Sequence, residues 1–141
     1  LCPSTVVTNG NDDGIGSLRF AIAQCSNPED YIYIAEFIDS IFLVSDTIIL
    51  DKNLSIFHSG NEKVVIQTTS SSPVFKTNPG VLITLNNIEI HSGGVASSKA
   101  LLNNGNTILW NVDIINSIPG EIPVMNTGIL EISETVQIKN Q

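Results

Sequence analysis

One short segment near the start of the chain has the spacing of a helix. In SLRFAIAQC (residues 17–25) apolar side chains recur at positions i, i+3, i+4 and i+7, which places them on one side of a helix. These residues are Leu18, Ala21, Ile22 and Cys25. Ser17 suits the N-cap of this helix, and Pro28 prevents its continuation. The preceding segment STVVTN is expected to be a short strand.

From residue 30 onward the pattern changes to short apolar segments typical of β-strands. Clusters of Gly, Asn, Ser and Pro separate them, too short for crossover helices and without the two-residue primed turns of regular hairpins. The segments are YIYIAEFI, SIFLVSDTIIL, NLSIFHSG, KVVIQTT, PVFKT, GVLITLNNIEIHSG, ALLNNGNTILWNVDIINS and GILEISETVQIKN. Apart from one helix, the chain is therefore expected to be all-β.

The last third of the chain contains an internal repeat. NNIEI (86–90), WNVDI (110–114) and ETVQI (134–138) follow one another at intervals of 24 residues. Their apolar positions superimpose as Ile88, Val112 and Val136, and as Ile90, Ile114 and Ile138. A period in the low twenties, with short strands and polar corners, is typical of one turn of a β-solenoid. We therefore predict a parallel β-helix; a β-sandwich is the alternative, but it requires antiparallel turn signals that are scarce here.

Asparagine is expected at the corners of the coils, because its side chain tolerates the left-handed backbone conformation and can stack on its equivalents. The candidates are Asn86, Asn87, Asn103, Asn104 and Asn111.

This pattern divides the chain into a cap and a stack of coils. Residues 1–30 form the N-terminal cap, a strand plus the helix at 17–25, and residues 31–141 form the coils of a single domain. A solenoid exposes unpaired strand edges at its end, and a short amphipathic helix placed once before the first coil can cover them. We expect the sequence to be a piece of a larger protein.

Composition and charge narrow the possible partners. Charged residues make up 14% of the chain, compared with about 25% in typical soluble domains. The net charge is −8, and the six Lys and Arg residues are scattered singly, which argues against binding to nucleic acid. No apolar run approaches the ~18 residues of a membrane-spanning helix, so we expect no membrane insertion.

The first 60 or so residues carry a resemblance to a known family. VVTNGNDDGIGSLRFAIAQCSNPEDYIYIAEF, followed by IILDKNLSIFHSG, resembles the opening of the right-handed parallel β-helix modules of large exported bacterial surface proteins of Bacteroidetes type. Those modules open with V-x-N-x-N-D-x-G-x-G-S-L-R-x-A-I, followed by a strand and a coil. The resemblance implies a right-handed helix and a secreted or cell-surface location. It implies no particular activity, because this scaffold hosts enzymes, adhesins and stalks alike. The matching cap positions are Asp13, Gly14, Gly16, Ser17, Leu18, Arg19 and Ile22.

The two cysteines, Cys2 and Cys25, bracket the opening segment. They are either two free buried thiols or a disulfide that ties the N-terminal segment to the end of the helix. An even number of cysteines in a strand-rich chain with few charges fits an exported protein. The family often has a cysteine near each position, which supports the disulfide.

The cap also resembles part of a calcium-binding loop. Asn9, Asn11 and Asp13, followed by Gly14, fit the first half of the D-x-[DN]-x-[DN]-G pattern. Phe20 occupies the position of the bidentate carboxylate. A polar turn, in which Asn and Asp side chains bond nearby backbone amides, is the competing interpretation, and it is the one we favour. Calcium is the one cofactor that the sequence suggests.

No complete catalytic arrangement is present, so we expect a protein that is not an enzyme. GNDD (10–13) matches the G-x-D-D motif of polygalacturonase-type hydrolases, but the N-T-D, G-H-G and R-I-K elements of that family are absent. Glu89 and Asp113 are expected to point outward at equivalent coil positions, with no basic residue accompanying them. Trp110 is the one aromatic candidate for stacking on a sugar. These three residues are the candidate glycan contacts.

The sequence favours a non-catalytic structural or adhesive module of an exported cell-surface protein, a stiff platform for contacts with another protein or a surface glycan. One alternative is a carbohydrate-binding or degenerate carbohydrate-active β-helix, assisted by calcium. Another is a terminal export or attachment domain. The open end of the C-terminal coil, ILEISETVQIKNQ, is a candidate site for self-association.

Overall fold

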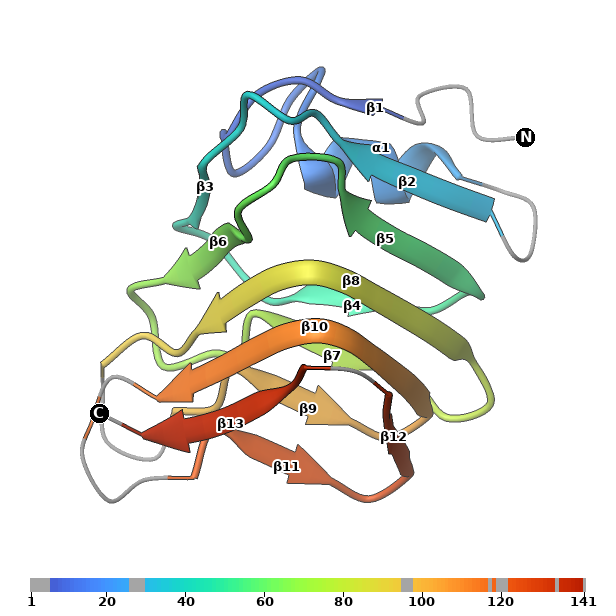
Figure 1. Cartoon of the computed structure of the whole chain (residues 1–141), viewed down its shortest axis with the longest axis vertical. Helices are drawn as coiled ribbons and strands as arrows, with labels where there is room; N and C mark the ends of the chain where they lie inside the picture. The colour runs from blue at the N-terminus through green and yellow to red at the C-terminus, as the bar shows by residue number, and fades with distance from the viewer. Residues whose placement is uncertain are drawn as a thin grey trace.

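All strand pairs among the described residues are parallel. The computed structural model describes residues 6–25, 30–94, 98–116, 118, 122–133 and 135–140. They form a β-solenoid of about five turns with one short helix at its N-terminal end (Figure 1). The predicted parallel β-helix is therefore confirmed, and the β-sandwich alternative, which requires antiparallel pairing, was wrong.

The strands form three faces around one core (Figure 1). The first face contains β1 (Val6–Val7), β2 (Asp30–Ile34), β5 (Leu54–His58), the first halves of β8 (Leu82–His91) and β10 (Asn106–Asn116), and β12 (Ile129–Ile132). The second face contains β3 (Ser40–Leu43), β6 (Val64–Thr68), the second halves of β8 and β10, and β13 (Gln137–Asn140). The third face contains β4 (Ile48–Leu50), β7 (Phe75–Thr77), β9 (Leu101–Asn103) and β11 (Val124–Asn126).

The core consists of ladders in which each turn places one aliphatic side chain on the equivalent side chain of the next. On the first face the register joins Ile32, Ile56, Leu85 and Leu109, all 0% exposed. On the second face it joins Ile41, Ile66, Ile90 and Ile114, also 0% exposed. Each buried side chain of this size contributes about 1.5–3 kcal/mol to folding. The alignment predicted from the 24-residue repeat is confirmed, because Ile114 pairs with both Ile90 and Ile138.

The cap helix α1 spans Leu18–Gln24, close to the predicted limits. Ser17 is its N-cap and accepts a hydrogen bond from the Phe20 amide at 3.1 Å. The backbone before it turns back through Gly16, where φ is +89° and an added Cβ would lie 2.6 Å from the Asn9 amide nitrogen. Only glycine fits both conditions, which explains this position of the cap motif.

Two cations attach the cap to the coils. The Arg19 guanidinium donates to the carbonyl oxygens of Asp12, Asp46 and Thr47, and it pairs with the Asp12 carboxylate at 3.0 Å. Lys52 donates to the carbonyls of Ile22 and Cys25 at the end of α1. A lysine near the C-terminal end of a helix hydrogen-bonds its last carbonyls and interacts favourably with the negative end of the helix dipole.

One corner of the solenoid differs in length between turns: it is a loop in the first two turns and a single asparagine in the next two. Between the first and second faces, the first two turns use five residues each, 35–39 and 59–63. The next two turns use only Asn87 and Asn111, with φ of 60° and 51°. The Asn87 amide donates to the carbonyls of His58, Gly60 and Glu62 at 3.2, 2.8 and 3.3 Å, and so caps the loop above it. Asn111 in turn donates to the Asn87 side-chain oxygen at 3.0 Å.

The corner between the third and first faces carries a second set of stacked asparagines. Asn103, which is fully buried, donates to the Asn126 side-chain oxygen at 2.8 Å, and Asn104 accepts from Thr127 at 2.6 Å. The corner positions predicted for Asn87, Asn103, Asn104 and Asn111 are confirmed. Asn86 lies instead within β8, one residue before the corner.

The Asp12 carboxylate links the cap to the coils in a pH-dependent way. Burial alone would raise the pKa of Asp12. Hydrogen bonds from the Ser45 hydroxyl and from Arg19, the positive charge of Arg19 and a backbone hydrogen bond from Val44 outweigh burial and hold this pKa below its ordinary value of 3.8. A group with a lowered folded-state pKa stabilises the fold above its unfolded pKa, and this contribution is lost as the pH falls through its folded pKa.

Asp12→Asn should therefore lower the free energy of unfolding by about 1 kcal/mol at pH 7. The difference from the wild-type chain should shrink as the pH falls below about 4, because Asp12 becomes protonated first in the unfolded chain and then, at lower pH, in the folded chain. Urea denaturation at several pH values measures it. Asp13→Asn, at an exposed neighbouring position, is the control and should change stability by less than about 0.5 kcal/mol. A constant difference across the pH range would contradict the assigned role of Asp12.

Asn87→Ala should lower the free energy of unfolding by about 2 kcal/mol or more, because it removes three hydrogen bonds and places alanine in the left-handed region. Asn87→Gly keeps the backbone freedom and should lose less, which separates the two effects. Asn86→Ala is the matched control and should be nearly neutral in thermal or urea denaturation. Equal losses for Asn86→Ala and Asn87→Ala would show that the corner has no special role.

Candidate functional site

The loop predicted as a calcium candidate is a turn that bonds to its own backbone. The Asn9 side-chain oxygen accepts from the Asn11 amide at 3.1 Å, and its nitrogen donates to the Ile15 carbonyl at 3.0 Å. The Asp13 carboxylate accepts from the Gly14 amide at 2.8 Å. Within the part of the chain that the structure describes, no three His, Cys, Asp or Glu residues lie close enough to hold a metal ion. The polar turn accounts for these contacts, and calcium binding stays a hypothesis.

The predicted disulfide involves Cys2, which lies outside the described residues, so the pairing stays a prediction. Cys25 is 1% exposed and follows directly after α1.

The two candidate acids lie on the second face, next to the asparagine corner. Glu89 and Asp113 are register partners on β8 and β10, as the repeat predicted. Glu89 lies 2.5 Å from His91 Nε2, and Asp113 lies 3.5 Å from Lys63 Nζ. The expectation that no basic residue accompanies them was wrong, because the wide corner at 59–63 brings Lys63 beside Asp113.

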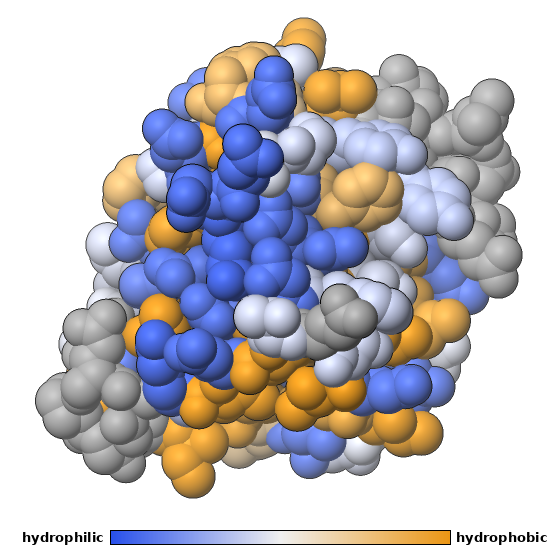
Figure 2. Space-filling view, in the orientation of Figure 1, coloured by the Kyte–Doolittle hydropathy of each residue, from blue (hydrophilic) through white to orange (hydrophobic). Residues whose placement is uncertain are grey.

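These acids line a polar hollow of about 400 Å³ together with Asn61, Glu62, Lys63, Asn87 and Asn111. Figure 2 shows hydrophilic side chains gathered in a band over β6 and the neighbouring parts of β8 and β10. Three carboxylates, those of Glu62, Glu89 and Asp113, and one cation, Lys63, line this hollow, so its net charge is negative.

Trp110 lies on the first face, not with the two acids. It is 40% exposed and is the register partner of Asn86. The three candidate glycan contacts are therefore divided between two faces on opposite sides of the Asn111 corner.

Trp110 instead shares the first face with three other aromatic residues, and we call this surface the aromatic face. Its outward side chains form two rows across β2, β5, β8 and β10. One row is Tyr31, Ser55, Thr84 and Ile108, and the other is Tyr33, Phe57, Asn86 and Trp110. Tyr31 is 55% exposed and Tyr33 is 41% exposed. None of these eight side chains is charged, in a chain whose net charge is −8.

The rings of the aromatic face hold one another in place. Phe57 makes edge-to-face contacts with Tyr33 at 4.4 Å and with Tyr31 at 6.0 Å between ring centroids. Such pairs add about 0.5–1.5 kcal/mol beyond the area that they bury. The rings therefore lie on a rigid sheet and also brace each other.

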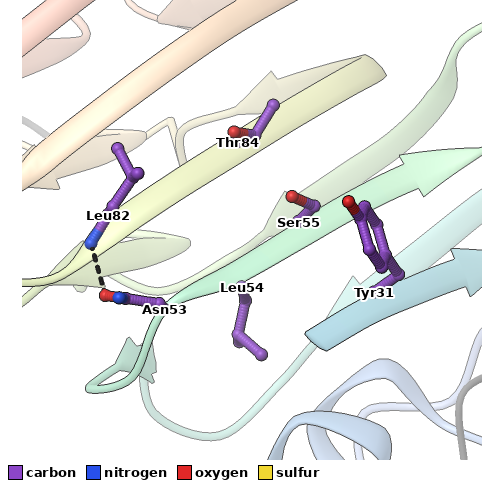
Figure 3. A pocket seen from close by; sticks show the side chains of 6 residues that line it. All are labelled: Tyr31, Asn53, Leu54, Ser55, Leu82 and Thr84. Atoms are coloured by element: carbon purple, nitrogen blue, oxygen red, sulfur yellow. Dashed lines mark hydrogen bonds between the residues drawn. The ribbon is translucent and has the colours of Figure 1, made fainter. Parts of the chain in front are cut away.

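Beside these rings lies a small open hollow of about 190 Å³ (Figure 3). Its lining residues come from β2, from β5 and the residue before it, and from β8: Tyr31, Asn53, Leu54, Ser55, Leu82 and Thr84. The Asn53 side-chain oxygen accepts from the Leu82 amide at 2.8 Å, which fixes its orientation. Among the described residues, the Asn53 side-chain nitrogen and the hydroxyls of Ser55 and Thr84 have no hydrogen-bond partner, so they are free to bind a ligand.

Sequence reasoning missed the two tyrosines of this face. In YIYI the isoleucines Ile32 and Ile34 are fully buried, so alternation directs Tyr31 and Tyr33 outward. That alternation was the available signal. Trp110 was therefore not the one aromatic candidate.

The C-terminal end of the solenoid is a second exposed apolar surface. Ile132 continues the ladder of Leu109 but is 55% exposed, and Ile138 continues that of Ile114 but is 38% exposed. Figure 2 shows hydrophobic side chains gathered along the lower side of the molecule, where the last turn lies. Together with Met125 and Ile129, they form what we call the open end.

None of the described helices is both long enough and apolar enough to cross a membrane. No protein-family model, curated protein or solved structure matches the chain.

Proposed function

We propose that this chain is a non-catalytic adhesive module of an exported cell-surface protein and that its aromatic face makes the contact. The observation that carries this proposal is the set of exposed, uncharged aromatic side chains of Tyr31, Tyr33 and Trp110 on one parallel sheet. Exposed apolar groups that gather on one face mark interaction sites, and aromatic residues contribute most of the binding energy at such sites. The opening motif and the two cysteines support an exported location.

The rigidity of the solenoid supports this role. The face is built from strands that pair on both sides, and its rings contact one another. A surface held in one conformation before binding loses little entropy on contact, so more of the interaction energy appears as affinity. A stiff platform therefore suits adhesion.

A variant with Tyr31→Ser, Tyr33→Ser and Trp110→Ser should lose adhesion, because it removes the exposed rings and leaves the core unchanged. Retention of beads coated with the module, on a panel of extracellular matrix proteins and polysaccharides, measures this. We expect at least a tenfold loss on the surface that binds the wild type, which corresponds to about 1.4 kcal/mol. Glu89→Gln with Asp113→Asn, on the second face, is the matched control and should adhere normally. Failure of the folded wild type to adhere to any surface would contradict the proposal.

A second candidate function is assembly through the open end, favoured by the exposed last members of the ladders. An exposed sheet edge with apolar ladders is a template for pairing with another strand. The N-terminal end carries α1 and the open end carries no helix among the described residues, so the two ends differ (Figure 1). The arrangement proposed here is tail-to-tail association of two open ends.

Light scattering coupled to size-exclusion chromatography should then show a dimer that forms as concentration rises. Ile132→Lys with Ile138→Lys should shift it to monomer, because each lysine would bring an unpaired charge into the contact. Ile15→Lys, at a cap position that is 85% exposed, is the control and should leave the dimer intact. A wild-type chain that stays monomeric at every concentration would exclude this assembly.

A further inference from the structure

We propose that the ligand of the aromatic face is a neutral glycan, with one pyranose ring seated in the hollow beside Tyr31. This inference rests on the proposed adhesive function and names the class of ligand that the same face would bind. It follows from the charge, the chemistry and the dimensions of the face.

The charge of the face points to an uncharged ligand. The chain has 20 charged residues in all, yet none of the eight residues in the two rows and none of the residues that line the hollow carries a charge. The nearest carboxylate in register is Glu131 of β12, which follows Ile108 at the far end of the first row from Tyr31. Burying a charged group of a ligand without a partner is costly, so such a face selects against anionic polysaccharides and charged protein surfaces. A neutral ligand needs no charged partner, so the lack of charge on this face does not weaken its binding.

The chemistry of the hollow matches the two kinds of surface that a sugar presents. A pyranose has C–H groups on the faces of its ring and hydroxyl groups around its edge. Tyr31 and Leu82 offer apolar surface on two sides of the hollow (Figure 3). The Asn53 amide nitrogen and the hydroxyls of Ser55 and Thr84 offer the hydrogen bonds. Ligand sites commonly combine apolar walls with a few placed polar groups in this way.

The dimensions favour one ring in the hollow and a longer chain across the face. At about 190 Å³ the hollow is smaller than the ~300–1,000 Å³ of pockets for drug-sized ligands. Trp110 lies on β10, three strands away from Tyr31 on β2. Three strand spacings are about 14 Å, which is longer than one sugar ring. An oligosaccharide can therefore contact both aromatic residues, and a monosaccharide cannot.

Binding by this face requires no metal ion. Glu89 and Asp113 lie beyond the Asn111 corner, on the second face, where they contact His91 and Lys63. Carboxylates, which calcium prefers as ligands, are absent from the lining of the hollow, and the first row meets one only at its far end, where Glu131 of β12 is the register partner of Ile108. The inference therefore predicts glycan binding that a chelator leaves unchanged.

The single tryptophan of the chain makes this inference testable directly, because all tryptophan fluorescence comes from Trp110 on the aromatic face. Fluorescence titration and calorimetry would use cellohexaose, xylohexaose, mannohexaose and maltohexaose, their disaccharides, and hexagalacturonate as the anionic probe, each with and without EDTA. We expect saturable binding of at least one neutral hexasaccharide with a change in Trp110 emission, at least tenfold weaker binding of its disaccharide, and no effect of EDTA.

Ser55→Leu should weaken that binding at least tenfold, because leucine fills the hollow and leaves the rings in place. Gln67→Leu, at an outward position on the second face, is the matched control and should bind as the wild type does. Circular dichroism and thermal denaturation confirm that both variants fold. Equal affinity of the two variants would overturn the placement of the sugar in the hollow.

The result also separates this inference from the proposed function. If no neutral glycan binds, or if hexagalacturonate binds more tightly, the inference is wrong. Adhesion to a protein surface that still depends on Tyr31, Tyr33 and Trp110 would in that case leave the adhesive function standing. If the wild type adheres to no surface and binds no neutral glycan, both are wrong.

Discussion

The in-register parallel pairing between successive turns is the constraint on which the rest of the structure depends. Because each residue pairs with its equivalent one turn away, every inward side chain must fit the same volume as its neighbours in the ladder. Aliphatic residues satisfy this in the core, as in the ladder from Ile32 to Leu109. The same pairing aligns the outward side chains, so Tyr31, Ser55 and Thr84 form a row although they are far apart in the sequence.

The corners are the demanding positions in such a regular stack, because there the chain must change direction while its backbone groups still find hydrogen-bond partners. Asparagine meets both needs, since it accepts a positive φ and its amide bonds to the turn above. Asn87 and Asn111 do this between the first and second faces. At another corner the buried Asn103 contributes only the second property, because its amide donates to Asn126 of the next turn. Arg19 and Lys52 solve the related problem at the cap, where the carbonyls of loops and of a helix end need donors.

The sequence predicted the fold better than the site, for a physical reason. The repeat that aligns Ile90 with Ile114 and Ile138 reflects the register of the strands directly. The spacing from Ser17 to Ile22 reflects one face of a helix. Both features can therefore be predicted from the order of residues alone. Lys63 lies beside Asp113 although the two residues are two turns apart. This contact arises because the corner at 59–63 is five residues long, whereas the corresponding corner two turns later is Asn111 alone. Such proximity depends on loop geometry, which periodicity does not encode. The tyrosines were predictable from alternation alone, whereas the hollow beside Tyr31 depends on the small size of Ser55 between larger neighbours.

The corner that changes from residues 59–63 to Asn87 has a consequence for how such a molecule can diversify. The strands on both sides of that corner keep their register although one turn has four more residues there than the next. The Asn87 amide satisfies the carbonyls of the longer loop, so the added residues are accommodated locally and shift no ladder. This corner is therefore a tolerant insertion point next to a fixed scaffold. Loops of different length and sequence can be exchanged there, as recognition loops are on an antibody framework, and the core need not be redesigned.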